Sequence, residues 1–248
     1  MKISAVVLTQ NNEKTIKRCL DSISFLDEII IIDSFSTDST VEICRSFSKN
    51  VSEKKFVCTA FSRNFGLQKA RNKWVFFIDS DEEASKELSS SLKSFSPEGN
   101  AAAYSVFIRT NYLGAWMKSA ALSQWQPRLF RKGKAAWSNR LCHAPPKISG
   151  NVSALKGSLL HHSIQSVSSH LKKLDYYTSR EAMQKKVQKD NNSLFLFPFR
   201  LFVDSSYVFL KRIFFEMAFL DGWRGMVFAC ISAYYEIVKD FKFFFKKY

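Results

Sequence analysis

The chain has 248 residues, 46% hydrophobic and 24% charged, with a formal net charge of +15. This length is sufficient for one substantial α/β domain with an appendage, and the positive charge favours nucleic acid, an anionic membrane or a phosphorylated substrate as partner. The five cysteines are scattered and show no CxxC spacing, which argues against a disulfide framework or a zinc site and favours reduced thiols in the cytoplasm.

The first hundred residues alternate between continuous apolar runs and segments with helical spacing. Buried strands are predicted at 2–9, 28–33, 55–60 and 74–79. Helices are predicted at 13–24, after Ser39, where Ser39 to Glu42 fits a capping box, and at 62–72. The N-terminal run is too short for the core of a signal peptide and is interpreted as the first strand. This alternation predicts a doubly wound, mostly parallel sheet.

The pattern changes after about residue 100. Strands are predicted at 101–109, 126–137 (a strand and turn) and 151–164, and a helical region begins at Ser166. We therefore expect a domain at 1–165 and a helical, basic, Phe-rich region at 166–248. Its longest apolar run, 226–235, is shorter than the roughly 20 residues of a membrane span, so this region is predicted to lie on a membrane surface or to pack on the domain.

An acidic cluster follows the predicted strand at 74–79. The segment WVFFIDSDEE places Asp79, Asp81, Glu82 and Glu83 at that strand's carboxyl end, where parallel sheets bind ligands, and Asp33 ends a neighbouring strand. Carboxylates spaced D-x-D on extended backbone can point the same way and hold Mg²⁺ or Mn²⁺ together with phosphate oxygens. The alternative is a strand-to-helix loop whose acids cap the next helix.

The ordered motifs resemble a known family. SAVVLTQNNEKTIKRCLDSI, DEIIIIDSFSTDSTVEI and WVFFIDSDE are similar to the nucleotide-sugar domain of inverting family 2 glycosyltransferases with the GT-A fold. LGAWM, PRLFRKGKAAW, LKGSLLHHS, LKKLDYYTSREA and FLDGWRG follow in the order found in the lipopolysaccharide core β-glucosyltransferase group, so the resemblance covers most of the chain.

The resemblance implies a UDP-sugar donor and assigns roles to residues. Nucleotide-sugar binding falls to Thr9, Gln10, Asn11, Asp33, Arg63 and Asp79, and metal binding to Asp81 with Asp79. Asp33 would accept the uracil N–H, unless it caps a helix instead. Arg63 would approach the nucleotide or its phosphates, unless it is a solvated helix residue. Countercharge at the departing diphosphate would stabilise an oxocarbenium-like transition state.

An inverting transfer also needs a base for the acceptor hydroxyl. The related group carries a His-Glu pair at this point, but here His143 is followed by Ala144. His143 itself, Glu82 or Glu83 could serve, and His143 could also be structural. His161 and His162 end a predicted strand, so at most one is expected to face the site.

The expected reaction transfers a hexose, with glucose favoured, to a lipid-linked saccharide such as the lipopolysaccharide inner core. The basic C-terminal region would hold the enzyme at the anionic inner face of the cytoplasmic membrane. Asp221, Trp223 and Arg224 would contact acceptor or membrane, or would only fix the angle between two helices.

Three other functions compete with this one. A nucleic-acid-binding protein suits the net charge, but the acidic cluster opposes it and no binding motif is present, so we expect no nucleic-acid partner. Another Mg²⁺-dependent nucleotide enzyme would be expected to carry a glycine-rich phosphate loop, and TQNNEKT has no glycine. A catalytically altered membrane-surface protein with the same fold fits the missing Glu after His143.

Overall fold

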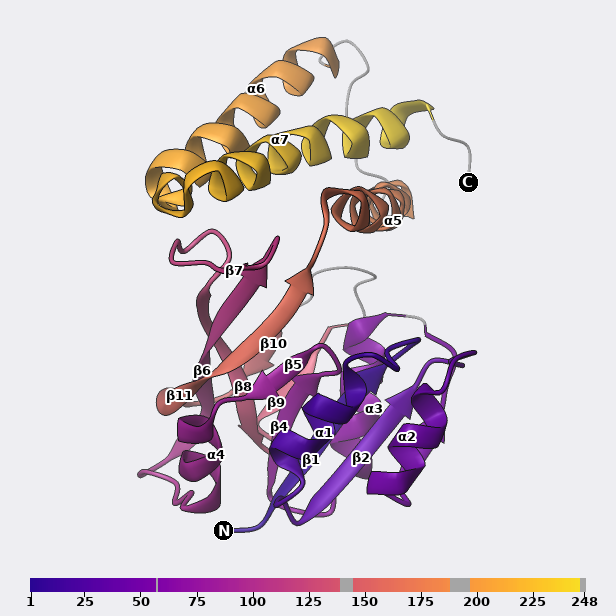
Figure 1. The fold of residues 1–248 in the computed structure, drawn as a ribbon, viewed down its shortest axis with the longest axis vertical. Coiled ribbons are helices and arrows are strands. Elements are labelled where there is room, and N and C mark those ends of the chain that lie inside the picture. Colours follow the sequence, from indigo (N-terminus) through magenta and orange to yellow (C-terminus); the bar gives the residue numbers. More distant parts are fainter. Residues whose placement is uncertain (57, 139–144, 188–196, 246–248) are drawn as a thin grey trace. The chain divides into compact units, whose positions relative to one another are not determined.

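The computed structural model describes residues 1–56, 58–138, 145–187 and 197–245. The chain forms two compact units (Figure 1). Unit 1 comprises Met1–Arg109 and Trp125–His162, and unit 2 comprises Thr110–Gln124 and Ser163–Tyr248. The helical unit thus begins close to the boundary expected at residue 165, but it also includes the segment 110–124, which the sequence assigned to the first domain.

Unit 1 is built on a mixed sheet. Its strands run in the order β3-β2-β1-β4-β8-β6-β11-β5, and β1 lies between parallel partners β2 and β4. The strands are β1 Ile3–Thr9, β2 Glu28–Asp33, β3 Val51–Glu53, β4 Trp74–Asp79, β5 Glu82–Ala84, β6 Ala101–Tyr112, β8 Gln124–Arg131 and β11 Asn151–Ile164, with β9 Ala135–Trp137 and β10 Pro146–Ile148 as a separate pair. The parallel strands place the carboxyl ends of β1, β2 and β4 at one edge.

Both faces of this sheet are buried, as the continuous apolar runs predict. Alternate residues of β4 enter different clusters: Trp74, Phe76 and Ile78 pack with one, and Val75 and Phe77 with the other. The first cluster contains residues of α1 (Ile16–Ile23), α2 (Thr40–Phe47) and α4 (Lys86–Lys93), and the second contains residues of α3 (Thr59–Lys69) and β9. Helices on both faces of a parallel core make the sheet doubly wound.

Two local expectations are wrong. The described residues of the segment 55–60 form no strand: the third strand is β3, and Cys58 is the N-cap of α3, with its sulfur accepting from the Phe61 N–H. The side chain of Ser39, at the N-cap of α2, makes no capping hydrogen bond, so the capping box is absent. Asp38 instead accepts from the Thr40 N–H at 3.0 Å.

Unit 2 is mainly helical. It contains β7 (Ala115–Trp116), α5 (Val167–Val187), α6 (Phe197–Leu210), a π-helical turn (Lys211–Phe215), a 3-10 turn (Ala218–Asp221) and α7 (Gly222–Phe245). A small core joins Tyr112, Met117 and Ile164 to Phe228 of α7. Within the described ranges, no helix combines the length and the hydropathy needed to cross a bilayer.

Candidate functional site

Three loops meet at the carboxyl edge of β1, β2 and β4. Asn11 follows β1 and has a positive φ of 52°, which lets its side-chain oxygen accept from the Thr37 N–H at 2.8 Å. Asn12 accepts from the Ser80 hydroxyl, after β4, at 3.0 Å. The Ser34 N–H, after β2, donates to the Thr9 carbonyl at 2.9 Å. These bonds fix the loops to one another before any ligand arrives.

The residues expected to hold the uridine lie along this edge. The Thr9 hydroxyl is buried and has no hydrogen-bond partner in the described part of the chain, so it is available to a ligand. Gln10 is exposed and donates to the Ser34 carbonyl at 3.1 Å. Asp33 is fully buried, and its two oxygens accept from the Ser36 N–H at 2.8 Å and the Ser36 hydroxyl at 2.5 Å. Asp33 therefore shapes the turn after β2.

Asp79, at the end of β4, lies between two arginines. Nη2 of Arg63, from α3, is 3.3 Å from each Asp79 oxygen, and Nη1 of Arg128, from β8, is 3.2 Å from Oδ2. Burial alone would raise the pKa of the Asp79 carboxyl, but the charges of Arg63 and Arg128 outweigh it and hold that pKa well below its usual range. Nε of each arginine is buried with no partner among the described residues, which leaves donors for an anion.

Glu82 completes a buried charged cluster with Asp79 and Arg128. Its Oε1 accepts from Nη2 of Arg128 at 2.5 Å, and its Oε2 accepts from the Asp79 N–H at 2.9 Å. The Glu82 side chain is only 1% exposed. Burial raises the pKa of the Glu82 carboxyl to about 7, although the Arg128 guanidinium opposes the shift. Because both oxygens are engaged, Glu82 orients Arg128 and the backbone of Asp79.

Asp81 meets a histidine from the antiparallel strand β11. Pairing of His161 with Glu82 across β5 and β11 brings Nε2 of His161 within 3.3 Å of Oδ2 of Asp81. Burial alone would lower the pKa of His161, but its bond to Asp81 and the charges of Asp81 and Glu82 raise that pKa overall. The neighbouring His162 lies 3.7 Å from Glu83, to which Arg18 is bound at 3.1 Å. As strand geometry requires, the two imidazoles meet different acids.

The acidic cluster is not a helix cap. Helix α4 begins after Ser85, whose hydroxyl accepts from the Leu88 N–H at 3.2 Å. The strand β5 lies between Asp81 and this cap. The carboxylates of Asp79 and Asp81 therefore do not cap α4, which was the alternative to ligand binding.

Carboxylate and imidazole side chains at this edge are candidate ligands for a divalent metal. The described residues hold no group of three or more His, Cys, Asp or Glu side chains arranged for an ion. Asp81 with His161 nevertheless offers two adjacent ligands, and the Asp79 carboxylate lies beside them on the same short loop. Such a partial set fits a Mg²⁺ or Mn²⁺ ion that takes its remaining ligands from diphosphate and water. A bound ion would neutralise charge on the leaving diphosphate.

The remaining predicted residues lie elsewhere. Asp221 accepts from the N–H groups of Lys118 and Ser119, at 2.7 and 3.2 Å, and Nε of Arg224 donates to the Leu113 carbonyl at 3.0 Å. These two residues fix a loop within unit 2, whereas Trp223 is exposed. His143 lies outside the described residues.

Sequence reasoning did not single out Arg128 and gave His161 a minor role. Arg128 lies in PRLFR, one of the segments that carry the family resemblance, but nothing in its spacing from Asp79 indicates contact across the sheet. The pairing of β4 with β8 supplies that contact. His161 required the register of β11 against β5.

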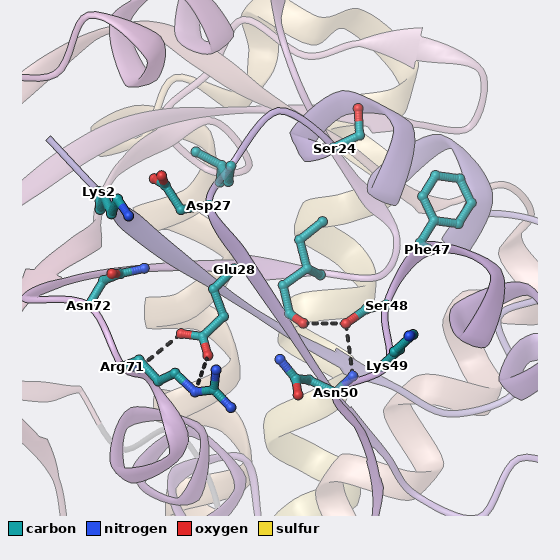
Figure 2. A pocket seen from close by; sticks show the side chains of 12 residues that line it. Lys2, Ser24, Asp27, Glu28, Phe47, Ser48, Lys49, Asn50, Arg71 and Asn72 are labelled. Atoms are coloured by element: carbon teal, nitrogen blue, oxygen red, sulfur yellow. Dashed lines mark hydrogen bonds and ion pairs between the residues drawn. The ribbon is translucent and has the colours of Figure 1, made fainter.

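A polar pocket of about 390 Å³ lies near the amino ends of β1 and β2 (Figure 2). Its charged groups are occupied by the fold: Glu28 pairs with Arg71 at 3.5 Å, and Asp27 accepts from the Ile3 N–H at 2.9 Å. Ser48 likewise donates to the Ile29 carbonyl at 2.6 Å. These contacts hold chain segments together at the edge opposite the acidic cluster.

Two solved structures share this fold and contain a bound nucleotide or nucleotide sugar. The mannosyltransferase PcManGT from Pyrobaculum calidifontis, solved with GDP-Man and Mn²⁺, is 14% identical, with a TM-score of 0.54 over 100% of this chain and 88% of that chain. TarS from S. aureus, solved with UDP, is 16% identical, with a TM-score of 0.53 over 97% of this chain and 91% of that one. The fold is therefore the GT-A fold expected from the motifs. The protein is a nucleotide-sugar-dependent glycosyltransferase because its sequence also matches the glycosyl transferase family 2 model.

The family follows from the sequence match. Residues 4–157 match the model for glycosyl transferase family 2, and the chain belongs to that family. An uncharacterized glycosyltransferase of Rickettsia typhi is 28% identical over 94% of this chain and 83% of its own length. The lipopolysaccharide core biosynthesis glycosyltransferase LpsC of Rhizobium meliloti is 26% identical over 98% of this chain and 92% of its own length. Both the fold and the family agree with the resemblance found in the motifs.

Proposed function

We propose that this enzyme transfers a hexose, with glucose as our assignment, from a UDP donor to a lipid-linked saccharide such as the lipopolysaccharide inner core. The transfer would invert the anomeric carbon and be assisted by Mg²⁺ or Mn²⁺. The observation that carries the proposal is the meeting of Asp81 and His161 beside Asp79 and its two arginines, at the carboxyl edge of the parallel strands. The name of the Rhizobium meliloti relative supports the class of acceptor.

The arginines have a defined part in this proposal. Arg63 and Arg128 already lie against Asp79 with buried, unpartnered Nε donors, so they need little reorganisation to meet a diphosphate. Fixed positive charge placed where negative charge develops is a large term in catalysis. Thr9 and Gln10 would contact the nucleoside, and Asp33 would act by holding the turn at Ser36.

We assign the catalytic base from the fact that the other candidates already have hydrogen-bond or ion-pair partners. Both oxygens of Glu82 accept hydrogen bonds, and Glu83 is bound by Arg18. We therefore assign His143 as the base that takes the proton of the acceptor hydroxyl. Changing His143→Ala would then lower turnover strongly while leaving UDP binding unchanged. Equal turnover in His143→Ala and wild type would refute this assignment.

Calorimetric titration tests the donor site. We expect UDP and UDP-glucose to bind wild type more tightly with Mn²⁺ than without it, and expect Asp81→Ala to lose that difference. A matched control is Asp21→Ala, which removes an exposed carboxylate paired only with Lys17 on α1. If folded wild type binds neither compound in the presence of Mn²⁺, the proposed donor is wrong.

The C-terminal helical region, 166–248, is proposed to place the enzyme on the cytoplasmic face of the membrane as a peripheral protein. Each Lys or Arg near an anionic surface contributes about 1 kcal/mol. The sequence suggests deleting residues 195–248 as a test, but this deletion would also remove Asp221 and Arg224, which hold the loop at Leu113–Ser119. Sedimentation of the full chain with phosphatidylglycerol-containing vesicles is therefore the better measurement. Absence of binding at low salt would refute a membrane location.

A further inference from the structure

Helix α6 presents an apolar face to the outside of unit 2. Its exposed large side chains follow helical spacing and are Phe199, Phe202, Val203, Tyr207 and Leu210. The surface of a globular helix is normally polar on this side, with its apolar stripe turned to the core. In α6 the Phe202 side chain is 75% exposed. The exposed stripe is therefore unexplained by the packing of the unit itself.

Helix α7 shows the same pattern at its start and over its second half. Its exposed apolar side chains, spaced mainly three and four residues apart, are Trp223, Met226, Tyr234, Ile237, Phe241 and Phe245. The turn between the two helices adds Phe214, Phe215, Met217, Phe219 and Leu220. Helices α6 and α7 pack side by side (Figure 1). Together these exposed side chains form what we name the outer apolar face.

Four of the five acidic groups of this helical pair and its turn have partners within unit 2. Glu216, in the turn, is paired with Arg212 and lies 3.4 Å from Lys211. Glu236 is paired with Lys239, and Asp240 binds Lys185 of α5 at 3.1 Å. Asp221 is held by two backbone N–H groups. These four acids therefore have partners within unit 2, and Asp204 of α6 is the one acid beside the exposed apolar side chains that this pairing leaves out of account.

We propose that the outer apolar face inserts into the interfacial layer of a lipid bilayer, with α6 and α7 lying in the membrane plane. The aromatic residues Trp223, Tyr207 and Tyr234 suit this layer because each has an apolar ring and a polar tip. Lys211, the first residue of the π-helical turn, is exposed and lies 3.4 Å from Glu216, so lipid phosphate would compete with Glu216 for it. The proposal rests on the membrane location given above, but it changes the main attraction from charge to apolar burial.

Salt separates apolar insertion from simple surface attraction. In about 1 M salt the Debye length falls to about 3 Å, so exposed charges lose most of their hold on a vesicle. We expect wild type to sediment with vesicles of phosphatidylcholine alone and to remain bound in this salt. Binding that needs phosphatidylglycerol and disappears in salt would overturn insertion while leaving the peripheral location intact.

A triple variant tests the residues. Phe202→Ser, Phe215→Ser and Phe241→Ser alter side chains that are all more than half exposed, so the fold should survive. With roughly tenfold for each of the three rings removed, we expect vesicle affinity to fall about a thousandfold. The matched control is Leu171→Ser, Tyr176→Ser and Met183→Ser, which alters three exposed apolar residues of α5 and should leave affinity unchanged. An equal loss in both triples would overturn the proposal.

Fluorescence gives a second measurement, which starts from the wild-type chain. Brominated phosphatidylcholine should quench part of the wild-type tryptophan emission, and Trp223→Phe should remove most of that quenching. Absence of quenching in wild type overturns insertion. Self-association without vesicle binding, abolished by the triple variant, would identify a second copy of the chain as the partner instead. UDP binding by the triple variant should equal that of wild type, so failure of the donor site is seen separately.

Discussion

At the residue scale, the buried charges of the site depend on one another. Arg128 is 7% exposed and is the shared partner of Asp79 and Glu82. A buried ion pair adds little net stability when it is intact, because desolvation of both charges opposes their attraction. Removing one member is costly because the other charge stays buried without compensation. The loss of Arg128 should therefore lower folding stability in addition to any effect on the diphosphate.

Replacing Arg128 alone should therefore destabilise the enzyme more than replacing Arg128 and Glu82 together. We expect Arg128→Met to lower the free energy of unfolding by about 3–5 kcal/mol, as for other broken buried pairs. The double variant Arg128→Met/Glu82→Gln should recover part of this loss. Chemical denaturation of both variants measures the difference. A double variant less stable than the sum of the two single changes would contradict the account.

A histidine in unit 2 should give the stability a pH dependence. Burial lowers the pKa of His170 to about 4, with Lys173 adding to the shift, and Tyr112 bonds its Nδ1 at 2.9 Å. The unfolded chain takes up this proton near pH 6.5. Between these values the unfolded state binds more protons, so stability is greatest above pH 6.5 and falls as the pH falls toward 4.

Denaturation at pH 6.5 and pH 4.5 checks this sign. The loss on acidification should be smaller in His170→Gln than in wild type, because the variant has no imidazole to protonate. An NMR titration of the wild-type imidazole should place its pKa near 4. Titration of His170 near its ordinary value would show that the ring is solvated, and would remove the predicted dependence.

The sequence singled out acidic residues of the candidate site but did not indicate which residues contact them. Asp79 and Asp81 could be located because they end an apolar run. Arg128 and His161 could not, because each reaches the site through strand pairing from a distant segment. The uracil contact expected of Asp33 stays a prediction, and the structure adds that both of its oxygens accept from Ser36, three residues along the chain.

At the element scale, the contact of α4 with β11 requires a glycine. Gly157 has a φ of +93°, and a Cβ there would lie 2.2 Å from the Leu88 nitrogen and 2.6 Å from its Cα. Gly133 also has a positive φ, +82°, but a Cβ there would meet nothing within 4 Å. Gly157 therefore combines backbone conformation with close approach, whereas Gly133 has only the first.

Alanine at these two positions separates the two effects. Gly133→Ala should cost about 1–2 kcal/mol of stability, from the left-handed backbone alone. Gly157→Ala should cost about 3 kcal/mol or more, because the helix backbone must also move. The unfolding free energies of both variants give the comparison. Equal costs would mean that α4 yields easily.

Elements with strong periodicity were predicted and weak ones were missed. The apolar runs of β1, β2 and β4 have no good alternative to a buried strand. The segment 55–60 was misleading because its apolar residues Cys58 and Ala60 are buried at the start of α3, not in a strand. The true third strand, Val51–Glu53, has three residues and too little periodicity to detect.

At the scale of the whole molecule, the division into units predicts the behaviour of a truncated chain. A chain that ends at residue 165 would keep Tyr112 and Met117 but lose Phe228, which packs with them. It would also lose Asp221 and Arg224, which bind the loop at Leu113–Ser119. Trypsin should cut this truncated chain quickly after Lys118 and the full chain slowly. Lys134, exposed in the turn before β9, should be cut equally in both. Equal cutting after Lys118 would show that the helices of unit 2 do not protect the loop.

The cluster of Asp79, Arg128 and Glu82 also limits how the enzyme can change over generations. A single mutation at Arg128 leaves the buried Glu82 carboxylate without its ion-pair partner, so selection would remove most such variants before a second change could occur. Among descendants of this chain, positions 82 and 128 should therefore change together or not at all. Their joint substitution would mark lineages in which the diphosphate is held in another way.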